Sequence, residues 1–223
     1  MHALIGKKVG MTRVADRFGQ IVGVTVIHAT PNTITQVRTV EKDGYRAVIL
    51  GHGDPNRTNK PQREQLKKVN AKAGETTMEI RTDRINTTQT EEPETVGTEH
   101  TVSVFKPGDV VNVVATSKGR GTVGTVKRHH FKIGPRSHGS MNLRRPGSIG
   151  AQQPQRVILG KRMAGRLGGT RTTVKHLEIL EVLPAEHLIV LKGAIPGIRG
   201  ATILIKQSIR HPRAESKQLG GDE

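Results

Sequence analysis

A stretch of 68 residues in the middle of the chain, Val110 to Leu177, contains no aspartate or glutamate. Residues 106–172 hold 14 Lys and Arg against a single acid, Asp109, and so carry +13 of the formal net charge of +17. The flanks are nearly neutral, at +3 over residues 1–105 and +1 over 173–223. Because a solvated surface normally mixes both signs, a merely basic face is a poor explanation. The charge favours a polyanionic partner, with nucleic acid first and an anionic membrane surface second.

The same segment lacks the pattern of a folded core. Glycines occur throughout it, and Pro135, Pro146 and Pro154 would break any long helix. Its apolar residues follow neither a period of 2 nor one of 3.6. About fifty residues of this kind cannot bury enough apolar surface to offset the entropy of ordering them. We therefore expect an extended basic finger over residues 117–170 that orders on a partner rather than around its own core.

The sequence on either side of the finger is β-like, with alternating or β-branched runs. Asp43-Gly44 is a typical hairpin turn between two of these runs. Short strands at this spacing predict a mainly β protein built on a small antiparallel barrel. Strands from both ends of the chain must pair across the finger, because neither set suffices alone. Strands are expected over residues 21–27, 33–40, 45–50, 101–105, 110–115, 173–183, 187–192 and 201–206.

Composition divides the chain into six parts. The polar region within residues 53–100 suggests an inserted α+β subdomain, with a helix over 61–73, a strand over 75–82 and an acidic surface loop over 87–100. The expected parts are the first part of the barrel (1–52), the inserted subdomain (53–100), barrel strands (101–116), the finger (117–170), C-terminal barrel strands (171–207) and a flexible tail (208–223).

One glycine motif resembles a nucleotide-binding loop. Residues 119–124 read GRGTVG, the G-x-G-x-x-G spacing. A dinucleotide site needs a helix next and an acid about twenty residues later, and a kinase needs two downstream catalytic aspartates. No acid follows Gly124 until Glu178. The glycines are better explained as positions where the backbone approaches phosphates closely.

Other chemistry is also poorly supported. His129, His130 and His138 form the densest histidine cluster, but no carboxylate lies near them and the chain has no cysteine, so we expect no metal site. Ser137-His138 has no acid to orient the imidazole. No apolar stretch approaches eighteen residues, and the N-terminus turns polar too soon for a signal peptide. We expect no enzyme, no cofactor, no small-molecule substrate and no membrane anchor.

The candidate site is therefore the set of cations, histidines and glycines that can meet a phosphate backbone. Phe131 is the only aromatic residue of the finger, so binding should depend on Arg, Lys, His and backbone more than on aromatic stacking. Gly119, Gly121, Gly124, Gly139, Gly147 and Gly150 would let the backbone approach phosphates. The expected nucleic-acid-binding side chains are Lys7, Lys8, Lys118, Arg120, Lys127, Arg128, His129, His130, Lys132, Arg136, His138, Arg144, Arg145, Arg156, Lys161, Arg162, Arg166 and Arg171.

Several segments together resemble the bacterial-type large-subunit ribosomal protein L3 family. The resemblance spans nearly the whole chain and is weakest over residues 53–100. Its segments are 6–12 (GKKVGMT), 24–27, 35–37, 43–47, 116–121 (TSKGRG), 124–129 (GTVKRH), 137–140 (SHGS), 145–150 (RPGSIG), 160–165 (GKRMAG) and 191–197 (LKGAIPG).

This resemblance implies a six-stranded translation-protein-type barrel with an α+β insert. It also implies a non-enzymatic protein of the cytoplasmic ribosome, whose finger penetrates large-subunit rRNA toward the peptidyl-transferase centre. Such proteins act early in subunit assembly and contact neighbouring large-subunit proteins. One stretch departs from the family: residues 151–156 lack its usual Pro-Gly pair. The position of a glutamine that some members methylate falls on Ala151, which leaves Gln152 or Gln153 as modification candidates.

Two other classes stay open at this point. A basic architectural DNA-binding protein would share the charge but should prefer duplex DNA. An enzyme using the glycine loop should bind a nucleotide.

Overall fold

The computed structural model describes residues 2–16, 18–69, 71, 73–82 and 95–208. They form two compact units, which we call the body (residues 1–116 and 171–208) and the finger (residues 117–170). Residues 87–94 of the expected acidic loop and 209–223 of the expected tail lie outside the described residues. Ser208, the first residue of that tail, is buried in the body, where its amide donates to the Val110 carbonyl.

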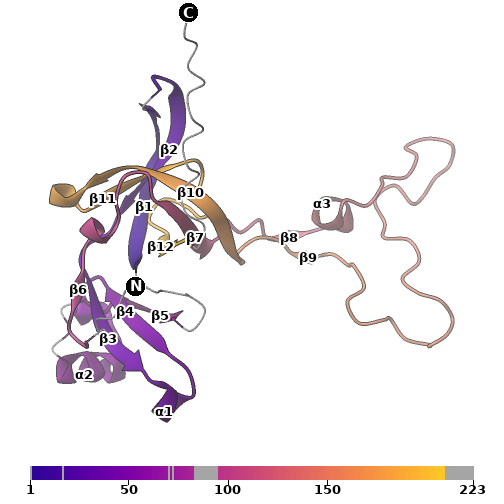
Figure 1. Ribbon diagram of the computed structural model, residues 1–223. Coiled ribbons are helices and arrows are strands. Elements are labelled where there is room, and N and C mark those ends of the chain that lie inside the picture. The colour runs from indigo at the N-terminus through magenta and orange to yellow at the C-terminus, as the bar shows by residue number, and fades with distance from the viewer. Residues whose placement is uncertain (1, 17, 70, 72, 83–94, 209–223) are drawn as a thin grey trace, which may run out of the picture. The chain divides into compact units, whose positions relative to one another are not determined.

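Six antiparallel strands close into a barrel (Figure 1). They follow one another around the barrel in the order β1 (Ala3–Ala15), β12 (Thr202–Gln207), β7 (Val110–Thr116), β10 (Arg171–Leu183), β11 (Leu188–Lys192) and β2 (Ile21–His28). The predicted barrel is confirmed. So is the pairing across the finger, because β7 bonds to both β10 and β12.

The barrel strands contribute side chains to two apolar clusters, because successive residues of a strand point to opposite faces. On β12, Ile203 and Ile205 point into the barrel, whereas Leu204 belongs to a second cluster outside it. Leu4 and its neighbour Ile5 divide between the two clusters in the same way on β1. Each of these strands is therefore apolar on both faces, one facing the barrel interior and one facing a second sheet.

That second sheet runs in the order β5 (Thr76–Arg81), β4 (Ala47–His52), β3 (Asn32–Arg38) and β6 (Glu99–His100). Its apolar residues Ile34, Leu50 and Ile80 pack with Ile5 and Leu204 of the barrel wall. Short helices connect its strands: α1 (Val40–Asp43), η1 (Pro55–Arg57) and α2 (Lys60–Lys68).

The expected domain boundary at residue 52 differs from the structure. Residues 32–52 form β3 and β4 of the second sheet, so the first barrel segment ends with β2 at His28. The alternation of a half-buried strand is the same in a barrel and in a covering sheet, and for this reason the sequence pattern does not distinguish them.

Three local expectations also need correction. Residues 101–105 form not a strand but the 3-10 helix η2 (Val102–Val104), because Val102 and Phe105, three residues apart, both enter the barrel core. The helix expected over 61–73 ends at Lys68. The long first strand β1 was not among the expected strands, since its lysines and glycines hide the apolar alternation. A further 3-10 turn, η3 (Pro184–Glu186), joins β10 to β11.

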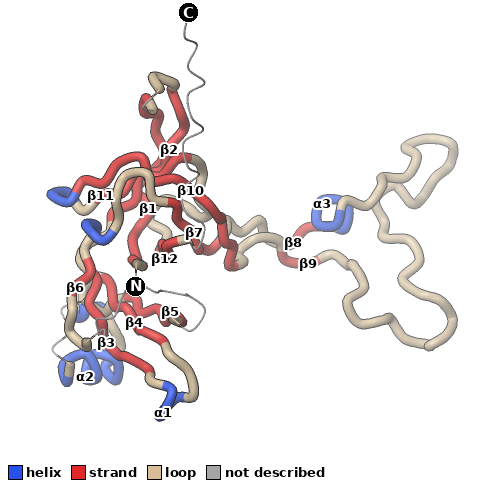
Figure 2. Tube along the Cα trace, in the orientation of Figure 1, coloured by secondary structure: helices blue, strands red, loops and turns tan. Residues whose placement is uncertain are grey.

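The finger has more internal structure than its composition suggests. A two-residue ladder pairs β8 (Thr122–Val123) with β9 (Gly165–Arg166), and α3 (Thr125–His129) follows β8 at once. Beyond α3 the chain forms wide loops without helix or strand (Figure 2). Thr125 is the one buried side chain among its residues. The finger thus has no apolar core of its own among the described residues, as expected, but the short ladder and α3 give it local order that its composition did not indicate.

Candidate nucleic-acid interface

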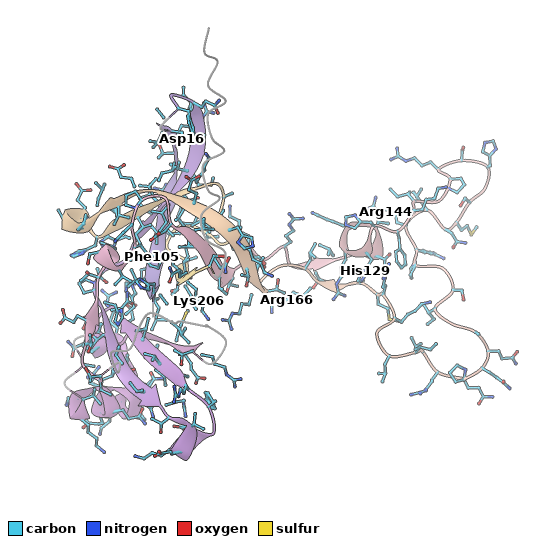
Figure 3. All side chains as sticks on the ribbon, viewed as in Figure 1. Asp16, Phe105, His129, Arg144, Arg166 and Lys206 are labelled. Carbon is cyan, nitrogen blue, oxygen red and sulfur yellow. The ribbon has the colours of Figure 1, made fainter. Side chains whose placement is uncertain are left out.

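The finger presents its charge to solvent. It holds twelve Lys and Arg and no Asp or Glu, so no carboxylate of the finger can neutralise them. Figure 3 shows Arg144 and Arg166 among side chains that project outward from the finger backbone. Of the predicted set, Arg171 is exposed at the start of β10 in the body. The exposed members within the finger are Lys118, Arg120, Lys127, His130, Lys132, Arg136, His138, Arg144, Arg145, Arg156, Lys161, Arg162 and Arg166.

Arg128 and His129, unlike the exposed cations, make contacts within the finger. The Arg128 guanidinium donates to the Met163 carbonyl at 2.8 Å, and Nε2 of His129 lies 3.0 Å from the same oxygen. Both side chains are partly buried, and a side chain at Gly165 would collide with Arg128. We call this contact the Met163 clasp. It holds the two runs of the finger together next to the β8–β9 ladder, so these two residues order the finger.

Backbone bonds close the base of the finger. The Ser117 amide donates to the Thr170 carbonyl at 2.9 Å, and the Gly169 amide donates to the Ser117 carbonyl at 3.2 Å. Farther along, the amides of Arg120 and Leu167 bond across the two runs at 2.8 and 3.0 Å. The base is therefore a defined hairpin stem, and the exposed cations lie along it and on the loops beyond.

The two predicted lysines near the N-terminus are engaged within the body. Lys7 Nζ lies 3.2 Å from a carboxylate oxygen of Glu75. Lys8 is buried, and its ammonium donates to the carbonyls of Ile195 at 2.8 Å and Gly197 at 3.4 Å. Lys8 thus ties the loop before β12 to β1, and the sequence carried no sign of this inward orientation.

The six predicted glycines fall into two groups. Gly121, Gly139 and Gly147 have positive φ angles of 68–74°, which side chains rarely adopt. The backbone conformation therefore favours glycine at these three positions, whether or not a partner approaches. Gly119, Gly124 and Gly150 lack a positive φ, and an added Cβ would meet nothing within 4 Å. The chain's own fold gives no reason for glycine there, which agrees with a close approach from outside.

Two predicted histidines and the candidate glutamines occupy turns. His130, at the end of α3, and His138 are both left-handed at φ 59°. Gln152 and Gln153 are exposed in a turn closed by the Gln155 amide, which donates to the Gln152 carbonyl at 3.0 Å. The Gln153–Pro154 peptide bond is cis.

Two titratable groups of the body were not singled out from sequence. Burial and, secondly, nearby Arg171 lower the pKa of Lys206, which is labelled in Figure 3. Burial and, secondly, Lys7 lower the pKa of His52, whose Nδ1 lies 3.2 Å from the Thr30 hydroxyl. Period-2 alternation puts Lys206 on the outer face of β12, so that signal could have drawn attention to it.

Comparison with known proteins identifies the family. The sequence profile of Ribosomal protein L3 matches residues 6–187. The chain is also 41% identical, over 209 residues, to the large ribosomal subunit protein uL3 of Carboxydothermus hydrogenoformans. That alignment covers 93% of this chain and 97% of the relative. The chain belongs to the ribosomal protein L3 family. The family resemblance drawn from short motifs along nearly the whole chain is thereby confirmed.

Membership in the L3 family makes the chain a ribosomal protein of the cytoplasm. The whole finger lies within the matched range, whereas β11 and β12, which complete the barrel, follow it. Across the described ranges, no helix is long and apolar enough to cross a membrane. Nor do the residues described bring together three or more His, Asp or Glu in a group that could hold a metal ion.

Proposed function

We propose that this L3-family protein is a structural constituent of the large ribosomal subunit that binds large-subunit rRNA and helps to initiate subunit assembly. Its finger would extend toward the peptidyl-transferase centre, and its body would contact neighbouring large-subunit proteins. The observation that carries the proposal is the finger itself, with twelve cations, no acid and nearly all of its basic side chains exposed. Family membership supports the choice of rRNA over DNA.

The proposed mechanism is electrostatic and mechanical rather than catalytic. Each finger cation that meets a phosphate releases counterions, and this release drives binding. If about eight finger cations engage phosphates, the slope of log affinity against log salt would be about −6 to −7. The finger is tethered at both ends to adjacent barrel strands, so it can enter a folded RNA while the barrel holds its base. The protein would thereby pin distant rRNA segments together.

Deletion of residues 118–168 tests the proposal. The remaining Ser117-Gly169-Thr170 would join β7 to β10 through a three-residue hairpin connection, a length that such strands accept. The backbone bonds between Ser117, Gly169 and Thr170 already bring the two ends together. We expect the body to stay folded, with a cooperative thermal transition, and the affinity for a large-subunit rRNA fragment to fall at least a hundredfold.

Unchanged affinity on that fragment would overturn the proposal. Competition between the rRNA fragment and duplex DNA of equal length separates it from the architectural DNA-binding alternative. We expect the rRNA to compete better at every salt concentration.

A further inference from the structure

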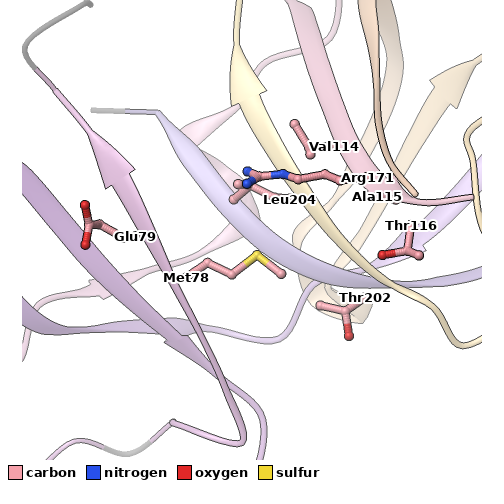
Figure 4. Close-up of a pocket in the computed structure, with 8 residues that line it drawn as sticks. All are labelled: Met78, Glu79, Val114, Ala115, Thr116, Arg171, Thr202 and Leu204. Atoms are coloured by element: carbon pink, nitrogen blue, oxygen red, sulfur yellow. The ribbon is translucent and has the colours of Figure 1, made fainter. Parts of the chain in front are cut away.

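A cavity of about 380 Å³ lies in the body between the second sheet and the outer wall of the barrel. Met78 on β5 projects toward the barrel from one side, and Val114 and Leu204 lie on the other (Figure 4). The hydroxyl residues Thr116 and Thr202 line the same cavity. It is therefore an aliphatic hollow with a few polar groups, the usual composition of a small-ligand site.

One cation lines this hollow, and a second lies just outside its lining, two residues beyond Leu204. Arg171, the first residue of β10, lines it, and Lys206 lies on the same outer face of β12 as Leu204, two residues further on. Burial lowers the pKa of Lys206, and the positive charge of Arg171 lowers it further. Within the described part of the chain neither side chain forms an ion pair.

The one acid of the cavity is already neutralised. A carboxylate oxygen of Glu79 lies 3.3 Å from Nε of Arg38. Among the described residues no carboxylate pairs with Arg171 or Lys206, and an anion bound there would supply the missing counter-charge. The positive charge favours a ligand with a phosphate or a carboxylate. The aliphatic walls favour a ligand whose anionic group is attached to an apolar group.

The size of the hollow restricts the ligand further. At 380 Å³ it lies near the small end of ligand pockets, roughly 300–1,000 Å³. It has no room for an RNA helix. RNA is read most specifically through single unpaired bases that leave their stack and enter such pockets. A nucleotide supplies an anion next to a flat, largely apolar base, the combination that this hollow matches.

We propose that the cavity holds one unpaired nucleotide of large-subunit rRNA, with its phosphate on Arg171 and Lys206 and its base against Met78 and Leu204. The inference rests on the proposed function, because it takes rRNA as the partner. It adds a second RNA site, built by the body and independent of the finger loops.

Methionine-methyl NMR on the full chain tests the site directly. Met78 lies in the cavity, Met11 on the exposed part of β1, and Met141 and Met163 in the finger, so each region has its own reporter. The probes are a single-stranded RNA octanucleotide of mixed sequence and an RNA duplex of the same length. We expect the Met78 signal to shift with the single strand and not with the duplex, and Met11 to stay unchanged with both.

The outcomes distinguish the two proposals. If neither RNA moves Met141 or Met163, RNA binding by the finger fails. If these two shift while Met78 does not, only the nucleotide site is overturned. A Met78 shift produced by an acidic, leucine-containing peptide but not by RNA would assign the cavity to a protein partner and also overturn it.

Charge-removing variants complete the test. Lys206→Met keeps the length and apolar stem of the side chain, so the body should stay folded. Loss of a charge-assisted phosphate contact should weaken the Met78 titration about tenfold. The matched control is Lys175→Met, which removes an exposed cation of β10, and it should change the titration less than twofold. If both variants weaken the Met78 titration equally, Lys206 acts only through the net charge of the protein, and the proposed phosphate contact is wrong.

Discussion

The body and the finger differ in the two properties that stabilise a folded unit: the burial of apolar side chains and the pairing of charges. Every buried apolar side chain among the described residues lies in the body, whereas the finger buries only Thr125. Cations of the body such as Lys7, Arg38 and Lys192 have carboxylate partners, whereas the finger contains no carboxylate at all. The body is stabilised by its own interior. Eleven of the twelve Lys and Arg side chains of the finger are instead exposed to solvent.

The finger is nevertheless not a featureless arm. Its base is held by backbone bonds, by the β8–β9 ladder and by the Met163 clasp. Order that exists before binding reduces the entropy lost on binding. The comparison therefore predicts that core substitutions matter only in the body, and that stem substitutions matter mainly for RNA affinity.

A pair of isoleucines gives the largest expected contrast. Ile203→Ala removes a fully buried side chain of the barrel core and should lower the free energy of unfolding by about 3 kcal/mol. Ile158→Ala makes the same chemical change in the finger, where the side chain is 62% exposed, and should change it by less than about 0.5 kcal/mol. Urea unfolding measures both. Similar losses would show that the finger contributes to the folded core.

A pair of glycines tests the stem. Gly168 has a φ of 74°, and a Cβ there would collide with the Lys118 carbonyl, so Gly168→Ala should strain the stem by about 1–3 kcal/mol. Amide exchange at Arg120 and Leu167 should accelerate at least fivefold, and rRNA affinity should fall. The midpoint of the thermal transition of the body should not change. Gly150→Ala, in open space and without a positive φ, should leave amide exchange unchanged.

Charge removal should separate free cations from engaged ones. Replacing both Arg144 and Arg145 by Gln should reduce the magnitude of the salt slope of rRNA binding by about 1.5, because two phosphate contacts are lost. Lys7→Gln should leave the slope unchanged, since its ammonium is paired with Glu75. It should instead cost less than about 1 kcal/mol of stability. A slope that falls with Lys7→Gln would place that lysine on the RNA.

The smallest expected effect is a pH dependence confined to the body. Burial, then Lys7 and His28, lower the pKa of His52, and Glu75 opposes them. A histidine whose pKa is lower in the folded state takes up its proton more readily in the unfolded chain. Stability should therefore fall as the pH drops through the ordinary histidine range near 6.5 toward the lowered value. His52→Gln should flatten this loss in urea unfolding between pH 7 and 5, and an unchanged slope would contradict the assignment.

Much of the body could be predicted because its strands alternate clearly. The runs that became β2, β7 and β12 were found within one or two residues. The strand β1 was missed, since Gly6, Lys7 and Lys8 interrupt its pattern. The boundary at residue 52 was wrong because β3 and β4 alternate as barrel strands would, and only their packing on the outer wall assigns them to another sheet.

The candidate site, like the fold, could be predicted from the sequence only in part. Residue type and charge were sufficient to select the finger and its cations. They could not reveal that Arg128 and His129 bond to a carbonyl 34 or 35 residues away, or that Lys8 turns inward to the loop at Ile195. Contacts between residues distant in the chain leave no mark in local composition.

The sequence by itself determined the antiparallel β class, the place and extent of the finger, its charge and the family. These follow from alternation, from the absence of acids and from short motifs, all of which are local properties of the chain. Tertiary structure alone decided which strands close the barrel, which cations are engaged, and that Arg171 lines an aliphatic hollow on the outer wall of the barrel. The physical reason is that burial and pairing depend on which surfaces meet, and the fold brings those surfaces together from both ends of the chain.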